Sequence, residues 1–464
     1  MKFGGTSMGS AARMRVAAAI CAGQAQQRPV SIVVSAMSKV TDLLLDTLRK
    51  AEVAEQAAIE ANIAELENRH NDTCRELLPA GRQDAVLESI HAIIGEFRRI
   101  AGGIMMLGER PPRAVDEAVA VGERLSALLI AAHLEAAGIP ARAVNAAQVI
   151  VTDAVFGNAT PLMEPTRRKA WTELVPLIEQ GILPVVTGFN GATIDGRKTT
   201  LGRGGSDFTA SILAAVLDAS DLWIWTDVDG IMTADPRLVP NAAVLSEVTY
   251  NEAAELAYNG AKVLHPRTLA PLVEKGIPVW SKNSFDLDKP GTRIAPTVSA
   301  EKGPRAVTSM GNVALLSIDA ADPELNGVQV MGRAMAALAL ANTELLILTS
   351  SSYRQNFCFL IRRDELPHAM ANLETAFALE LAHGYLKPFE LDEDVGLLTI
   401  VGEGMRGVPG FAGRIFTAIS RAGVNIIAIA QGSSELTIGI VVQRDGLEKA
   451  VCAVHDECGL GATG

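Results

Sequence analysis

KFGGTS (residues 2–7) and TTLGRGGSD (residues 199–207) are the two stretches that decide the fold. Each joins a glycine-rich turn to charged residues. Together they supply two backbone surfaces for anionic oxygens, a lysine that neutralises charge, and an arginine and an aspartate that orient an acceptor. Neither stretch is G-x-x-x-x-G-K-[ST], and that motif occurs nowhere in the chain, which excludes a P-loop enzyme. The two stretches indicate phosphoryl transfer on another architecture.

The composition predicts a globular protein of two or three domains. The chain has 464 residues, too many for one ordinary core, and 48% of them are apolar while only 4% are aromatic. This mixture suits buried parallel strands covered by alanine-rich helices. The net charge of −12, without any basic block, argues against a nucleic-acid partner.

The cysteines and the hydropathy predict a soluble, cytoplasmic protein with no membrane partner. Five cysteines are scattered without metal-ligand spacing, and no apolar run reaches ~18 residues. No metal ligand set is expected among the side chains. Only Met1 to Phe3 precede the first glycine loop, so either the first strand is short or the start lies upstream of Met1.

The order of the predicted elements indicates an α/β fold. RPVSIVVSA (28–36) has the pattern of a buried strand, a helical excursion covers about residues 41–110, and residues 115–137 are expected to form one helix with a Gly-Glu-Arg kink. Strands and helices then alternate up to about residue 295. Such alternation predicts a mostly parallel sheet sandwiched by helices, with ligands at the carboxyl ends of its strands.

A change of composition near residue 296 predicts a domain boundary, and an internal repeat follows it. Residues 327–361 align with residues 407–442, with a constant offset of 81 residues from Arg333 and Arg414 onward. Each copy has the pattern strand, helix, strand, strand, which predicts two ferredoxin-like α+β modules. We therefore expect domains at 1–295, 296–385 and 386–464, with the two small modules pairing with each other or across a dimer.

The first loop has the features of a phosphate site. Gly4 and Gly5 let backbone N–H groups approach anionic oxygens, and Lys2 supplies a positive charge beside them. Thr6 and Ser7 are expected to cap a helix that begins near residue 9. A second anion-friendly helix start follows in SAMSKVTD (35–42), where the hydroxyls belong to Ser35 and Thr41.

The arginine and the acids describe a pocket for an amino acid. Arg203 presents a planar fork that matches a carboxylate, and Ser206 and Asp207 open the following helix. Glu123 lies on an apolar helical stretch and needs a cation if it is buried. That cation is either a substrate ammonium or a neighbouring arginine such as Arg124.

The later motifs suit a nucleotide. Thr226 and Asp227 follow an apolar strand, and Arg237 and Lys262 are cations in reach of phosphates by their place in the motifs. His265 precedes a proline and is interpreted as structural. A carboxylate acceptor is already ionised at pH 7, so a site with lysines, arginine and acids but no histidine base fits a kinase that forms an acyl phosphate.

With these residues assembled, the chain resembles the aspartate kinases of the amino-acid kinase superfamily, with tandem C-terminal ACT modules. The resemblance covers essentially the whole length. It rests on motifs that occur in the family's order: KFGGTS, SAM-x-x-x-TD, VGER, TTLGRGGSD, TDVDGI-x-TADPR and GAKVLHP.

The resemblance implies ATP-dependent phosphorylation of L-aspartate to 4-phospho-L-aspartate, the entry to lysine, threonine and methionine synthesis. MgATP enters as a substrate complex, and no tightly bound prosthetic group is implied. The catalytic groups implied are Lys2, Asp207 and Lys262. The aspartate contacts implied are Ser35, Thr41, Glu123, Arg203 and Ser206. The nucleotide contacts implied are Lys2, Gly4, Gly5, Thr226, Asp227, Arg237 and Lys262.

The tail implies feedback regulation by an amino acid, threonine or lysine, and a homodimer or higher oligomer through the ACT modules. Asn425 and Gln431 match the family's effector-binding text in the second module, whereas the first module departs from it. Met232 stands where the family often has an aromatic residue near the nucleotide. The identity of the effector and the module that binds it are not given by the sequence.

Two alternatives compete with a feedback-regulated aspartate kinase. The first is a related kinase for another carboxylate or for carbamate, against which the paired modules and the Glu123/Arg203 pocket argue. The second is a catalytically silent amino-acid sensor. Its only support is the short first strand, and it predicts the loss of charged groups such as Lys2, Lys262 and Asp207, all of which are present.

Overall fold

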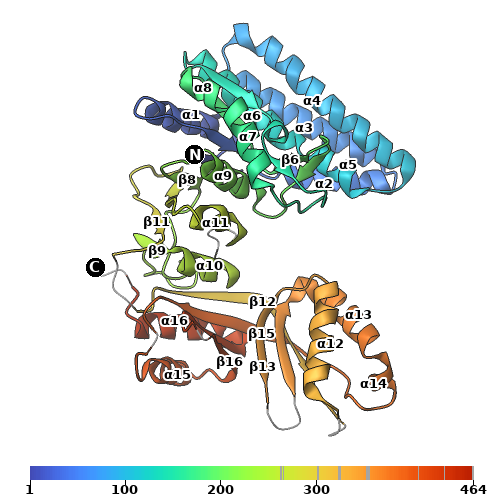
Figure 1. Ribbon diagram of the computed structural model, residues 1–464, viewed down its shortest axis with the longest axis vertical. Coiled ribbons are helices and arrows are strands. Elements are labelled where there is room, and N and C mark those ends of the chain that lie inside the picture. Colours follow the sequence, from blue (N-terminus) through green and yellow to red (C-terminus); the bar gives the residue numbers. More distant parts are fainter. Residues whose placement is uncertain are drawn as a thin grey trace. The chain divides into compact units, whose positions relative to one another are not determined.

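The computed structural model describes residues 1–261, 264, 266–299, 303–321, 325–351, 356–405, 407–432 and 434–461 (Figure 1). The chain divides into two compact units. Unit 1 comprises Met1–Ile231, Ser246–Tyr250 and Leu264–Val298, and unit 2 comprises Met232–Leu245, Asn251–Val263 and Ser299–Gly464. The domain limits 1–295, 296–385 and 386–464 stay a prediction.

Unit 1 is built on an eight-stranded sheet. Every neighbouring pair of strands is parallel except β10 and β11, so the mostly parallel sheet predicted from the sequence is confirmed. The strand order is β3 (Ala141–Val144), β5 (Leu183–Thr187), β2 (Ile32–Val34), β1 (Lys2–Phe3), β8 (Leu222–Thr226), β10 (Val279–Asn283), β11 (Thr292–Ala295) and β9 (Glu247–Thr249).

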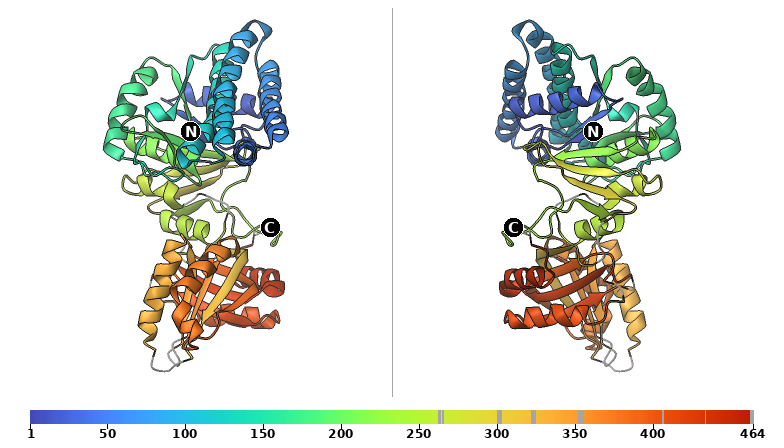
Figure 2. Two further views of the ribbon diagram at one scale, coloured as in Figure 1. Left: turned by 90° about the vertical axis from the view of Figure 1, so that its right-hand side faces the viewer. Right: turned by 90° about the vertical axis from the view of Figure 1, so that its left-hand side faces the viewer.

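Helices cover both faces of this sheet (Figure 2). Ile32 and Val34 of β2 join one core with α1 (Ala11–Ala25) and α6 (Val121–Ala136). Val33, between them, faces the other side, where it lines a space together with Ala210 and Leu213 of α9 (Gly205–Val216). This alternation is what a strand buried on both faces requires. Further helices of unit 1 include α7 (Met163–Glu173), α8 (Val175–Glu179) and α11 (Pro266–Val273).

The predicted helical excursion consists of three helices, α2 (Val40–Glu52), α3 (Gln56–Leu77) and α4 (Ala80–Leu107) (Figure 1). The single helix expected over residues 115–137 is in fact two, α5 (Pro112–Val119) and α6, which meet at Ala120. The expected kink at Gly-Glu-Arg was wrong, because the helix breaks before that run and these residues lie in the first turn of α6.

A small sheet of β4 (Val151–Thr152), β6 (Asn190–Thr193) and β7 (Lys198–Thr200) stands beside the main one. β6 and β7 form an antiparallel hairpin. Because β7 ends at Thr200, the hairpin leads directly into the LGRGGSD turn and fixes where that turn begins.

Unit 2 contains a six-stranded antiparallel sheet into which both repeats are merged. β12 and β15 pair along their length, for example Val307 with Ile400, so the repeats pair with each other within one chain. The strand order is β13 (Leu345–Ser350), β14 (Phe357–Arg362), β12 (Ala306–Ile318), β15 (Glu390–Val401), β17 (Thr437–Gln443) and β16 (Ile426–Gln431). The helices are α12 (Gly327–Leu340), α13 (Leu366–Ala376), α14 (Ala378–Ala382), α15 (Phe411–Arg421) and α16 (Leu447–Glu457).

Two segments that precede the two repeats in sequence pack in unit 2. The Thr233 carbonyl accepts a hydrogen bond from the Val307 N–H at 2.7 Å, and its Oγ1 lies 3.0 Å from His455 Nε2. The segment around α10 (Tyr250–Tyr258) is held in the same way, because Thr308 Oγ1 donates to the Asn259 carbonyl at 2.9 Å. In the described part of the chain, no helix is both long and apolar enough to cross a membrane.

The cap of α1 differs from the expectation. The helix begins at Ala11, and Ser10 Oγ accepts from the Arg13 N–H at 3.4 Å, so neither Thr6 nor Ser7 is its cap. Ser7 is buried instead and lies 2.8 Å from Ser284 Oγ. The turn after β1 is therefore longer than predicted, and one of its hydroxyls is tied to Ser284, the residue that follows β10.

We expect Ser10→Ala to lower the free energy of unfolding by about 0.5–1 kcal/mol, because an N-cap acceptor is lost. Thr6→Ala, at an exposed position four residues earlier, is the matched control and is expected to be neutral. Urea unfolding of both variants measures the difference. Equal stability of Ser10→Ala and the parent would contradict the cap assignment.

Candidate active site

One cavity of 670 Å³ in unit 1 collects most of the residues predicted to bind substrate. Its wall is formed by loops that follow β1, β2, β5 and β7, as expected where the carboxyl ends of neighbouring strands meet. The predicted residues that line it are Lys2, Gly5, Ser35, Thr41, Glu123, Arg203, Ser206 and Asp207. Predicted residues from four separate parts of the sequence thus meet at one place.

Lys2 and Asp207 form the charged centre of this cavity. Lys2 Nζ lies 2.6 Å from Asp207 Oδ1, and Lys2 is 7% exposed. Lys2 is held in the middle of the sheet because β1 pairs with both β2 and β8, while Asp207 lies in the first turn of α9. A buried lysine with a single carboxylate partner is a cation that an incoming phosphate can attract.

The first glycine turn packs closely against its neighbours. The Gly4 N–H donates to the Trp225 carbonyl at 3.1 Å, and a Cβ on Gly4 would lie 3.5 Å from Lys2 Nζ. A Cβ on Gly5 would lie 3.2 Å from the Ala36 carbonyl, tighter than most contacts of this kind. Glycine at these positions lets the KFGGTS turn and the SAM turn approach each other beside the lysine.

Glu123 is a buried carboxylate with one oxygen unpaired. It is 3% exposed; Oε1 accepts the Ala36 N–H at 3.2 Å, whereas Oε2 has no hydrogen-bond partner among the described residues. Burial raises the pKa of Glu123 to about 7, against a weaker opposing effect of the hydrogen bond. A Cβ on Gly122 would lie 2.8 Å from Ala36 Cβ, so glycine there allows α6 to reach the SAM turn.

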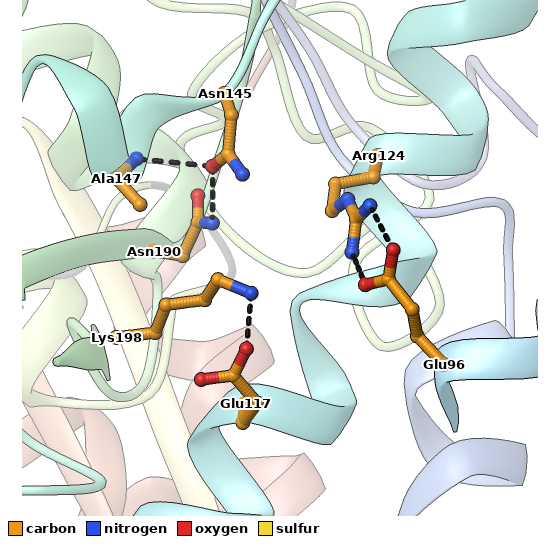
Figure 3. A network of polar contacts seen from close by, with 7 residues as sticks. All are labelled: Glu96, Glu117, Arg124, Asn145, Ala147, Asn190 and Lys198. Carbon is orange, nitrogen blue, oxygen red and sulfur yellow. Dashed lines mark hydrogen bonds and ion pairs between the residues drawn. The ribbon is translucent and has the colours of Figure 1, made fainter. Parts of the chain in front are cut away.

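The neighbouring arginine is not the partner of Glu123. Arg124 binds Glu96 of α4 through two hydrogen bonds of 2.5 and 3.1 Å, and Figure 3 shows the two side chains pointing toward each other. Arg124 and Glu123 are adjacent on a helix and face different sides. Of the two partners that the sequence left open for Glu123, the neighbouring Arg124 was therefore wrong. The unpaired Oε2 is available to another cation.

The turn that carries Arg203 is shaped by glycine. Gly202 and Gly204 have φ angles of 76° and 69°, values that favour glycine, and Arg203 between them is exposed at the cavity. Within the described chain no ion pair is formed by Arg203. Its guanidinium is therefore available to a carboxylate in the cavity.

Phe189 closes the other side of this turn under backbone strain. Its φ is 71°, unusual for a bulky residue, and the Asn190 N–H bonds back to the Gly188 carbonyl at 2.8 Å across it. A Cβ on Gly205 would lie 2.6 Å from the Phe189 ring. Strain of this kind persists where surrounding structure holds it, and it clusters at functional sites.

The hydroxyls predicted at helix starts are where the motifs imply. Thr41 is in the first turn of α2 and Ser206 in the first turn of α9, and Ser35 follows β2. Lys39, before α2, has a φ of 64° and also lines the cavity. Two helix N-termini, with their partial positive charge, thus contribute to one wall.

The predicted nucleotide residues are divided between the two units. Thr226 is the last residue of β8 in unit 1 and Asp227 follows it, and the Thr226 carbonyl accepts the Ser284 N–H at 2.8 Å. Arg237 belongs to unit 2, where it pairs with Asp235 at 2.5 Å and is largely exposed. Met232 forms an isolated bridge with Val244. Lys262 and His265 lie outside the described residues, so their predicted roles are not addressed by the geometry.

A second cavity, of 320 Å³, lies in unit 2 at the start of α15. Gln431, one of the two predicted effector residues, lines it, together with Glu435, which accepts the Gly407 N–H at 3.0 Å. Asn425, the other predicted residue, is exposed just before β16 and does not line this cavity. The apolar part of its wall is formed by Met405, Val408, Phe411 and Ile438.

Asp116 also lines the active-site cavity, although the sequence analysis did not select it. It is 1% exposed, and burial raises its pKa while hydrogen bonds from Gly157 and Thr200 oppose the rise. Its place seven residues before Glu123, within the helical pattern of residues 115–137, was the available signal. The signal was weak because its partners lie far away in the sequence.

Two family profiles and a related protein match this chain. The profile of the amino acid kinase family matches residues 1–283, and that of the ACT domain matches residues 398–458. The aspartokinase of Schizosaccharomyces pombe is 30% identical over 98% of this chain and 92% of that protein. The chain belongs to the aspartokinase branch of the amino acid kinase family.

Solved structures of aspartokinases share the fold over its whole length. Aspartokinase III of E. coli in complex with aspartate and ADP has a TM-score of 0.84 and 29% identity, with 98% of both chains covered. Its complex with lysine and aspartate has a TM-score of 0.80. The α/β fold with C-terminal ACT modules, predicted from the sequence, is thereby confirmed.

The family also contains longer proteins. The bifunctional aspartokinase/homoserine dehydrogenase 1 of Arabidopsis thaliana is 32% identical over 100% of this chain but over only 51% of that protein. The chain thus spans about half the length of the bifunctional relatives it matches.

We expect Glu123→Gln to stabilise this aspartokinase homologue at pH 8. A carboxyl group whose pKa is raised on folding contributes stability at low pH that is lost as the pH rises from 4.5, its ordinary pKa, through about 7. That shift corresponds to about 3 kcal/mol at ~1.4 kcal/mol per pKa unit, a cost that the neutral amide avoids.

Chemical denaturation at pH 5 and pH 8 measures the effect. The stability of the parent is expected to fall between these pH values by more than that of Glu123→Gln. Parallel pH profiles for the two proteins would show that Glu123 titrates normally in the fold.

Proposed function

We propose that this protein transfers the γ-phosphoryl group of MgATP to the side-chain carboxylate of L-aspartate, forming 4-phospho-L-aspartate and ADP. The observation that carries the proposal is the unpaired, buried oxygen of Glu123 in the same cavity as Arg203, which has no ion pair among the described residues. One anion and one cation of this kind suit the two charged groups on the α-carbon of an amino acid. The product would enter lysine, threonine and methionine synthesis in the cytoplasm.

The α-carbon groups orient the substrate. Arg203 would bind the α-carboxylate through its planar fork, and Glu123 would accept hydrogen bonds from the α-ammonium. An ammonium group beside Glu123 would stabilise the ionised form of the carboxylate and offset the cost of burying its charge. The hydroxyls of Ser35, Thr41 and Ser206 would complete the contacts, and the side-chain carboxylate is then directed toward Lys2.

The transfer step needs positioning and charge neutralisation rather than a base. One oxygen of the substrate's side-chain carboxylate forms the new bond to the γ-phosphorus, while the bond from that phosphorus to the β,γ-bridging oxygen breaks and ADP leaves. The acceptor is already ionised, so no proton is removed. Lys2 would leave its contact with Asp207 in part and follow the negative charge of the transferring group.

The nucleotide would be held by backbone and cationic groups named by the motifs. Gly4 and Gly5 offer backbone N–H groups, and Lys262 and Arg237 would neutralise phosphates. Thr226 and Asp227 would contact the nucleoside. Magnesium arrives with ATP as part of the substrate and prefers phosphate and water oxygens.

Regulation is proposed to come from the ACT unit. The 320 Å³ cavity beside α15 offers the Gln431 amide, the Glu435 carboxylate and apolar walls to an amino acid, threonine or lysine. Asn425, which does not line this cavity, would act only in an assembled form. A homodimer or higher oligomer through the ACT modules is part of the proposal.

The test is ATP-dependent trapping of the acyl phosphate with hydroxylamine, which yields aspartyl hydroxamate. The assay is run with L-aspartate and, as a control, L-glutamate, each with and without threonine or lysine. Hydroxamate from aspartate and not from glutamate supports the proposal. ATP-independent signal, or none with any carboxylate, would favour the silent sensor instead.

We expect Lys2→Met to lower kcat by about 100-fold or more, because a charge that stabilises the transition state is lost while the shape is kept. The aspartate KM should change little. Steady-state kinetics with both substrates measures the split. An effect confined to KM would remove Lys2 from the transfer step.

We expect Arg203→Ala to raise the aspartate KM by about 10-fold or more and to leave the ATP KM within about 2-fold, because a charged hydrogen bond to the α-carboxylate is lost. Arg197, a partly exposed arginine paired with Asp195, supplies the matched control Arg197→Ala. Unchanged aspartate saturation in Arg203→Ala would refute the carboxylate assignment.

A further inference from the structure

Asp116 binds three hydrogen-bond donors and no cation among the described residues. Its Oδ2 accepts the N–H groups of Gly157 at 2.8 Å and Thr200 at 2.9 Å, and its Oδ1 accepts the Thr200 hydroxyl at 2.7 Å. It is buried in the wall of the active-site cavity. A desolvated carboxylate is costly unless its acceptor capacity is used, so these three bonds fix the positions of its partners.

Arg267, at the start of α11, binds oxygen atoms of two segments, close to Gly157 and Thr200, the two residues that Asp116 contacts. It donates to the carbonyls of Ala159 at 2.8 Å and Leu201 at 3.3 Å, and it also binds the Asn158 side chain. Its guanidinium lies 4.8 Å from the centre of the Phe208 ring on α9. The planar fork of arginine suits several acceptors at once.

The two segments are the turn at residues 157–159 and the chain that enters the Arg203 turn. They contact each other directly: the Ala159 N–H donates to the Thr200 carbonyl at 2.9 Å, and a Cβ on Gly202 would lie 2.6 Å from Asn158 Oδ1. Asp116 accepts hydrogen bonds from N–H groups of these two segments, and Arg267 donates hydrogen bonds to their oxygens. The base of the turn is therefore held by opposite charges, while the Arg203 side chain projects freely.

We propose that Asp116 and Arg267 are positioning residues for aspartate binding, which act by holding the base of the Arg203 turn in its binding geometry. The substrate in this inference, aspartate, rests on the proposed function. The role of Asp116 and Arg267 in holding the turn does not depend on it. A displacement of about 1 Å at a binding group is enough to cost about 100-fold in efficiency. Neither residue needs to touch aspartate to have this effect.

The experiment compares Asp116→Ala, Asp116→Asn and Arg267→Lys. The matched control is Glu117→Gln, the next residue on α5, whose carboxylate faces Lys198 instead (Figure 3). The alanine removes all three acceptors. The asparagine keeps an acceptor for the two N–H groups and can donate its amide hydrogen to the Thr200 hydroxyl.

Kinetics is the first readout. We expect Asp116→Ala to raise the aspartate KM by about 10-fold or more with the ATP KM unchanged, Asp116→Asn to restore most of the loss, and Glu117→Gln to match the parent. Arg267→Lys should resemble Asp116→Ala, because a single ammonium cannot reach all three oxygens. In a double-mutant cycle, Asp116→Ala and Arg203→Ala should be strongly non-additive.

Hydrogen exchange of residues 199–207 is the second readout and does not depend on activity. Faster exchange there in Asp116→Ala, with parent-like exchange in β1 and β2, supports the inference even if aspartate proves not to be the substrate. Additive kinetic effects in the cycle, or unchanged exchange in the turn, would overturn it. If Asp116→Ala does not fold, Arg267→Lys decides by the same two readouts.

Discussion

The desolvation of Glu123 is the constraint on which the candidate site depends. A carboxylate that is 3% exposed, with one oxygen unpaired among the described residues, is unfavourable without a cation beside it, and burial raises its pKa to about 7. A fold without a use for this group would gain stability by replacing it. Under the proposed function, the ammonium group of a substrate bound in the cavity would offset the desolvation cost of Glu123.

The sheet brings the remaining groups to this point. β1 is only two residues long, yet it pairs with strands on both sides, so Lys2 and the glycine turn are held in the middle of the sheet. Along α5 and α6, residues that line the cavity alternate with residues that form ion pairs elsewhere: Glu117 with Lys198 and Arg124 with Glu96 (Figure 3). Partly exposed pairs contribute about 0–1 kcal/mol each, so their value here is orientation rather than stability.

The fold class and the residues of the motifs could be predicted from the sequence because they depend on local sequence patterns. The mostly parallel sheet follows from alternating strands and helices, and the two α+β modules follow from a repeat with a constant offset, although that repeat left open whether they pair with each other or across a dimer. Lys2, Arg203 and Asp207 were selected by motif, and the structure brings them to one cavity, although their roles stay predictions.

The features that the sequence did not reveal depend on distant contacts. Arg124 pairs with Glu96, 28 residues away, and Asp116 binds Thr200, 84 residues away; neither separation leaves a periodic trace. The cap of α1 was misjudged because three hydroxyls compete within residues 6–10. The place of residues 232–245 in unit 2 arises from packing against β12 and α16, elements more than 60 residues further along.

Calorimetric titration of L-aspartate at pH 7, repeated in buffers with different ionisation enthalpies, tests the central claim most directly. If Glu123 receives the substrate ammonium, binding converts a half-protonated carboxyl group into a carboxylate and releases about half a proton per aspartate, since its pKa is about 7. The release should vanish in Glu123→Gln. Aspartate binding with no proton release in the parent, or with the same release in the variant, would contradict the account.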